Sequence, residues 1–137
     1  MQITRQTEYG VRILLELAQA PEGQLVSSHI ISTRQDVPEM FLQKTLQLLS
    51  RAGLVITQRG VQGGVRLAKP AESITIADVL VAIEGPLAIN VCLNAGYNCH
   101  NMEVCKVRSI LVRAQEALAV ELSKESLADI IAMSEEG

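Results

Sequence analysis

The chain has 137 residues, enough for one domain or two small ones, and 48% of them are apolar, which suffices for a hydrophobic core. No apolar run reaches the roughly 18 residues of a transmembrane helix and no secretory signal opens the chain, so we expect a cytoplasmic protein. The net charge of −3 argues against a nucleic-acid partner, but the charge is unevenly distributed. Residues 1–69 carry eight Lys or Arg against five Asp or Glu, whereas residues 70–137 carry four against ten. Only the front half is therefore expected to meet a polyanion.

Two helices are predicted at the start of the chain. Residues 4–20 repeat apolar side chains at helical spacing, with Thr4 as a cap and Pro21 after the last turn. A second, shorter helix begins at Ser27 or Ser28, either of which can cap it. A turn at Asp36 and Val37 ends this helix, whose buried residues should be Ile30 and Ile31.

A third helix is predicted from Pro38 to about Ala52. Proline is tolerated in the first turn, because its missing N–H would have no helical partner there, and Gly53 suits the position after the last turn. The inward face is expected to consist of Phe41, Leu42, Leu46 and Leu49. The outward face carries long, mostly polar side chains that could reach base edges or phosphates in a DNA major groove, namely Glu39, Met40, Gln43, Lys44, Gln47 and Arg51.

Beyond Gly53 the apolar pattern alternates, which predicts a β-hairpin with strands at residues 54–57 and 65–68. The turn between them holds three glycines and Arg59, an arrangement that suits contact with a minor groove or a phosphate. Three helices followed by a hairpin within 70 residues are typical of a winged helix-turn-helix. We therefore expect a mainly α fold with a small hairpin, in which residues 1–70 form the DNA-binding domain.

Residues 71–137 are expected to hold a cysteine loop and a dimerisation helix. Thr75 and Asp78 predict a capped fourth helix that ends at Gly85. A long helix over residues 102–123 repeats apolar side chains in steps of three and four, which favours a homodimer through this helix over packing on its own domain. Its apolar seam comprises Val104, Val107, Leu111, Ala114 and Leu118, and a short helical stretch with Leu127, Ile130 and Ile131 follows.

All three cysteines, Cys92, Cys99 and Cys105, lie in one stretch without a hydrophobic period. In a reducing compartment, clustered thiols are more often metal or cluster ligands, or redox groups, than disulfides. Three readings follow: an iron–sulfur site, thiols that sense oxidants directly, or a structural zinc site completed by His100. No nucleophile with a paired base, phosphate loop or HExxH motif occurs, so an enzyme is not expected.

Residues 48–55 and 59–68, together with the cysteine triplet, resemble the winged-helix iron–sulfur regulators that include IscR, NsrR and RirA. Residues 1–4 and 75–79 fit the resemblance as well. It implies a dimeric bacterial transcription regulator, a repressor, whose operator binding is controlled by an iron–sulfur cluster that senses nitric oxide, redox state, iron or cluster supply. It also implies that the third helix enters the major groove of double-stranded DNA and that Arg59 enters the minor groove. The resulting DNA-contact set is Pro38, Glu39, Met40, Gln43, Lys44, Arg51, Arg59, Gly60 and Gly63.

The resemblance further implies a cluster held by Cys92, Cys99 and Cys105. IscR-type members take a fourth ligand from a His three residues after the last cysteine, but Arg108 stands here and cannot ligate. NsrR-type members take a carboxylate from the first helix of the other subunit, and Glu8 occupies the matching position. We therefore expect Glu8 as the fourth ligand, ahead of His100, water or a small thiol. The spacing of the first two cysteines leaves the cluster type open, with 4Fe-4S slightly ahead of 2Fe-2S.

Overall fold

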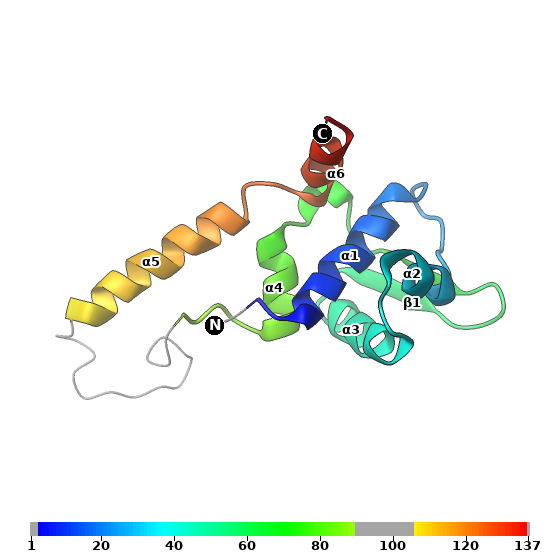
Figure 1. Cartoon of the computed structure of the whole chain (residues 1–137), viewed down its shortest axis with the longest axis horizontal. Coiled ribbons are helices and arrows are strands. Elements are labelled where there is room, and N and C mark those ends of the chain that lie inside the picture. The colour runs from blue at the N-terminus through cyan, green and yellow to red at the C-terminus, as the bar shows by residue number, and fades with distance from the viewer. Residues whose placement is uncertain (1–2, 90–105, 137) are drawn as a thin grey trace.

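The protein is described by a computed structural model that covers residues 3–89 and 106–136 (Figure 1). It is mainly α-helical with one small antiparallel sheet, and three helices precede the hairpin, as the sequence predicts. In chain order the described elements are α1 (Arg5–Gln19), α2 (Ser28–Gln35), α3 (Glu39–Arg51), β1 (Val55–Gln58), β2 (Gly64–Leu67), the 3-10 helix η1 (Ala71–Ser73), α4 (Ile76–Glu84), α5 (Lys106–Leu122) and α6 (Leu127–Glu136).

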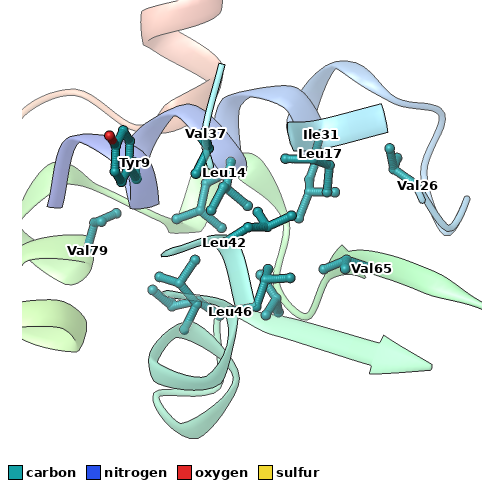
Figure 2. Packing of buried hydrophobic residues seen from close by; sticks show 14 of the residues in the cluster. Tyr9, Leu14, Leu17, Val26, Ile31, Val37, Leu42, Leu46, Val65 and Val79 are labelled. Carbon is teal, nitrogen blue, oxygen red and sulfur yellow. The ribbon is translucent and has the colours of Figure 1, made fainter. Parts of the chain in front are cut away.

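Helix α1 is the centre of the hydrophobic core. Its residues Ile13 and Leu14 are fully buried, and α2, α3, α4 and α6 all pack against it. Gly10 allows α4 to approach closely, because a Cβ at this position would lie 3.2 Å from Cγ1 of Val79. Figure 2 shows how side chains of α1, α2 and α3 meet in this core. The close approach of Val79 to Gly10 explains why a glycine stands in the middle of this helix, where glycine costs about 1 kcal/mol relative to alanine.

The predicted helix caps are confirmed. The Thr4 hydroxyl accepts from the N–H of Thr7 at 3.4 Å, and the Ser27 hydroxyl accepts from the N–H of His29 at 3.2 Å. Thr75 and Asp78 form a complete capping box, in which each side chain accepts from the backbone N–H of the other. These local bonds satisfy N–H groups that a helix leaves free in its first turn.

Two predictions about inward-facing residues are wrong. Ile31 is fully buried, but Ile30 is 39% exposed, because the short helix α2 turns only one narrow face to the core and Ile30 points about 100° away from Ile31. In α3, Leu42 and its helical repeats are buried as predicted, whereas Phe41 is 46% exposed. The Phe41 ring instead packs against Tyr9 of α1, with 6.0 Å between ring centroids.

The hairpin pairs in the expected antiparallel sense, with each strand shifted by one residue from its predicted bounds. Val55 lies opposite Leu67, and Gln58 lies opposite Gly64. A third segment joins the sheet: Val26 and Val65 exchange two backbone hydrogen bonds, each 2.8 Å long. Strand β2 is therefore bonded, near the turn of the hairpin, to the residue immediately before the cap of α2.

The C-terminal part divides between the core and a projecting helix. Leu127 at the start of α6 is fully buried, and its N–H donates to the carbonyl of Ile74 at 2.8 Å. Helix α5 extends away from the core in Figure 1 and has no buried residue among those described. The core thus takes residues from both sides of residue 70, and the functional division into residues 1–70 and 71–137 stays a prediction. No helix in the described ranges has the length and hydrophobicity needed to cross a bilayer.

Candidate nucleic-acid interface

The outward face of α3 and the hairpin border a cleft of about 830 Å³. Gln43, Gln47 and Arg51 line it from α3, and Arg59 lines it from the hairpin turn. Polar side chains with two arginines therefore face one hollow, with a helix on one side and a β-turn on the other. Such an arrangement can approach a polyanion from two directions.

The geometry of α3 follows from its amphipathic sequence. Leu42, Leu46 and Leu49 are buried on one side, which directs Gln43 and Lys44 to the exposed side. Thr45 is also buried on the inner side, where its hydroxyl donates to the carbonyl of Phe41 at 2.7 Å and so has a partner. The helix can therefore lie on the core with its polar face entirely free of core contacts.

A buried carboxylate holds the preceding helix in place. Glu16 of α1 is only 8% exposed, and its two oxygens accept from Nη1 of Arg34 at 2.9 Å and from Nε2 of Gln35 at 2.8 Å. Both donors lie in the last turn of α2, just before Asp36, which adopts a left-handed conformation with φ +51°. Glu16 thereby fixes the end of α2 from which the chain turns into α3. Sequence reasoning missed this role, although a Glu between buried apolar positions was a visible signal.

The hairpin turn requires glycine at two of its positions. The N–H of Gly63 donates to the carbonyl of Gly60 at 3.0 Å, and Gly60 has φ +115°. A Cβ at Gly63 would lie 2.0 Å from the carbonyl oxygen of Gln58, which is impossible without moving the backbone. This turn presents the exposed side chains of Arg59 and Val61.

The structure brings most of the predicted contact residues together. Those that border the cleft are Gln43, Arg51, Arg59, Gly60 and Gly63. Pro38, Glu39 and Met40 lie exposed at the start of α3, and Lys44 is exposed one turn further on. The Glu39 carboxylate lies 3.5 Å from Nδ1 of His29 in α2, a contact that links the exposed starts of the two helices. Further polar residues line the cleft that sequence reasoning did not place there, namely Ser27, Ser28, Ser50, Thr57 and Gln58.

The predicted cluster ligands are only partly within the described residues. Cys92, Cys99, Cys105 and His100 lie outside them. Glu8 is exposed in the first turn of α1. Nearby, Thr4 and Thr7 both donate their hydroxyls to Oε1 of Glu84, the second at 2.8 Å, which ties the start of α1 to the end of α4. Among the described residues, no group of three His, Cys, Asp or Glu side chains could hold a metal ion.

Two connected helices beside a β-hairpin, with the polar face of the second helix exposed, define a winged helix-turn-helix of the kind that binds DNA. The model of the Rrf2 family, described as iron-dependent transcriptional regulators, matches residues 3–133, so the chain belongs to the Rrf2 family. Its members are DNA-binding transcription regulators and not enzymes, which confirms two predictions from the sequence.

Solved structures agree with this assignment. The chain is 26% identical to CymR (YrzC) of B. subtilis, described as the global cysteine regulator, with 97% of this chain and 98% of that chain covered and a TM-score of 0.75. It is 27% identical to T. potens IscR, with 99% and 90% covered and a TM-score of 0.76. A protein of Listeria innocua is 28% identical, with 96% and 87% covered and a TM-score of 0.76. The match extends over α5 and α6 as well as the winged helix.

Proposed function

We propose that the chain is a homodimeric, cytoplasmic repressor whose operator binding is controlled by an iron–sulfur cluster. The observation that carries the proposal is the polar cleft between α3 and the hairpin in the same chain as three closely spaced cysteines, in a family described as iron-dependent. Thiolates are the usual protein ligands of iron–sulfur clusters. When bound, such a cluster supplies iron that reacts with oxygen or nitric oxide and is lost when iron is scarce.

The proposed ligands are Cys92, Cys99 and Cys105 with Glu8 of the partner subunit. The carboxylate of Glu8 fits this role because it is exposed in the first turn of α1, where a partner subunit can reach it. Glu8 belongs to the helix on which α3 packs, so a ligand here would connect the cluster to the DNA-reading face. This proposal slightly favours a 4Fe-4S cluster over a 2Fe-2S cluster.

For DNA, we propose that α3 enters the major groove and that the hairpin reaches the adjacent minor groove. The recognition helix of a helix-turn-helix contacts base edges with its first residues, and here these are exposed. Arg51 and Arg59 on the two sides of the cleft would pair with phosphates or the minor groove. The proposed contacts are Pro38, Glu39, Met40, Gln43, Lys44, Arg51, Arg59, Gly60 and Gly63.

Dimerisation is proposed to use helix α5. Val107 of the predicted seam is 64% exposed on this helix of 17 described residues, and Leu111, Ala114 and Leu118 follow it on the same face, none of them buried. A second copy would cover this apolar surface, and it would place two DNA-reading faces in one particle. Dimers of helix-turn-helix proteins read two half-sites about one helical turn apart.

The experiment that tests this function measures iron and acid-labile sulfide per chain, with an absorbance spectrum and operator binding, on protein purified without oxygen. Near-stoichiometric iron and sulfide, together with an operator affinity that changes when the cluster is removed, are the expected results. Glu8→Ala should reduce cluster retention, whereas Glu22→Ala, which removes an exposed carboxylate after α1, should not. Zinc or no metal in the protein purified without oxygen, or an operator affinity that does not change when the cluster is removed, would refute cluster control and leave the DNA-binding function.

A second candidate function is a winged-helix regulator without a cluster, in which the same thiols sense oxidants or hold zinc. The similarity to a B. subtilis protein described as a cysteine regulator favours keeping this candidate. It differs from the first in its metal content, so the same analysis of iron, sulfide and zinc separates the two.

A further inference from the structure

The two most exposed large hydrophobic side chains of the described residues both belong to the proposed DNA-reading elements. Val61 in the hairpin turn is 106% exposed, and Met40 in the first turn of α3 is 82% exposed. The next, Val107 at 64%, lies on the proposed dimer helix. Single exposed hydrophobic residues are common on protein surfaces, but the concentration of the two extreme cases on one interface calls for a specific explanation.

Met40 points directly away from the core. With 100° between successive residues of an α-helix, it lies about 170° from the mean direction of the four buried residues of α3. Its neighbour Phe41 is half-exposed but has a packing partner in the ring of Tyr9. Gln43 and Lys44, three and four positions on, share the exposed face with Met40. In the proposed docking, Met40 is therefore the residue of the first turn that enters the groove most directly.

The chemistry of a methionine limits what it can recognise there. Major-groove base edges present hydrogen-bond donors and acceptors, and one apolar group, the C5 methyl of thymine. A thioether pressed against the N7 and O6 acceptors of guanine would exclude water without replacing its hydrogen bonds. Against a thymine methyl, the same side chain gains apolar contact, and its flexibility allows it to fit the position of that methyl.

We propose that Met40 contacts the C5 methyl group of one thymine in each operator half-site and so selects an A·T pair at that position. The inference rests on the proposed entry of α3 into the major groove, and it adds the base identity that this residue reads. Specificity here comes from apolar shape, while Gln43 and Lys44 beside it can supply hydrogen bonds to neighbouring bases or phosphates.

The test removes the methyl group alone. An operator is first selected from random duplex DNA with the full-length protein, and each thymine is then replaced singly by deoxyuridine. The wild type should lose about three- to fivefold in affinity at one thymine per half-site, the effect of removing one buried methyl group. Met40→Ala should bind the thymine operator more weakly and should show no further loss with deoxyuridine at that site. Met40→Leu should recover most of the sensitivity.

Val61→Ala is the matched control, because it truncates an equally exposed apolar side chain in the proposed minor-groove element. The thymine methyl does not project into the minor groove, so this variant should keep the full loss with deoxyuridine. Both side chains are exposed, so neither variant should change the thermal unfolding temperature.

A wild type that is insensitive to deoxyuridine at every thymine would overturn the Met40 inference, and so would a Met40→Ala variant with undiminished sensitivity. In both cases operator binding itself would be intact, so the proposed function would stand. Failure of the wild type to enrich any duplex sequence would overturn both, because no recognition helix would then be reading DNA.

Discussion

Replacing Glu16 by alanine tests whether the buried carboxylate holds α2 in position for DNA binding. The change removes two acceptors, one for the Arg34 guanidinium and one for the Gln35 amide, at 2.9 and 2.8 Å. Both hydrogen bonds end on the charged carboxylate, and bonds that involve a charged group contribute about 1.5–3 kcal/mol. Arg34 is 68% exposed and can return to water, which reduces its share toward the value of a surface ion pair. We expect a loss of about 1–3 kcal/mol in the free energy of unfolding.

Urea and thermal unfolding provide the measurement. For a domain of this size, each kcal/mol lost from the free energy of unfolding lowers the melting temperature by roughly 3–5 °C. Glu16→Gln retains one carbonyl acceptor, so its free energy of unfolding should lie between those of Glu16→Ala and the wild type. Glu22→Ala removes an exposed carboxylate that makes no hydrogen bond or ion pair with the described residues. It should change the free energy of unfolding by less than about 0.5 kcal/mol.

A double-mutant cycle identifies the contact. The losses of unfolding free energy caused by Glu16→Ala and by Arg34→Ala should add to more than the loss in the double variant, with a coupling energy of about 0.5–1.5 kcal/mol. Operator affinity, measured where every variant is fully folded, should also fall for Glu16→Ala, since α2 and α3 would lose a fixed orientation. Full additivity together with unchanged operator affinity would refute the reasoning that Glu16 positions the helix-turn-helix.

Three further predictions follow from the hairpin and the core. Gly63→Ala should weaken operator binding with little change in global melting temperature, because its Cβ would collide with the carbonyl oxygen of Gln58, while Gln62→Ala in the same turn should bind normally. Arg59→Ala should reduce affinity by roughly 1–3 kcal/mol and reduce its salt dependence, and an unchanged salt dependence would remove Arg59 from the phosphate or minor-groove contacts. Leu127→Ala should cost about 2–5 kcal/mol in unfolding free energy, since the side chain is fully buried; a cost below 1 kcal/mol would show that α6 is not part of the core.

Features that depend on neighbouring residues were predictable from the sequence. The caps at Thr4 and Thr75 and the outward face of α3 each require only a few adjacent positions, and each is present in the structure. Phe41 was misplaced because its position is decided by Tyr9, a residue 32 positions earlier that no local pattern connects to it. The pairing of Val26 with Val65 and the return of Leu127 to Ile74 were missed for the same reason.

The candidate site divides in the same way. Residues on α3 and in the glycine turn could be found from helical spacing and turn chemistry. Ser27 could not, because it lies beside the cleft through the tertiary pairing of its neighbour Val26 with Val65 in β2. Glu16 is an intermediate case, since its place in an apolar stripe was visible but its partners in α2 were not.

The two hydrogen bonds between Val26 and Val65 have a consequence for how an operator can be regulated. They connect β2 to the residue before the cap of α2, and Glu16 connects the other end of α2 to α1, so the helix and the β-turn that are proposed to approach DNA are bonded into a single template. In the proposed docking, opening this template to fit a half-site of different groove width would break these bonds, so the DNA would have to bend instead. An effector that alters affinity would then act by reorienting whole templates within a dimer, which makes the distance and phase between half-sites the operator features most sensitive to the signal.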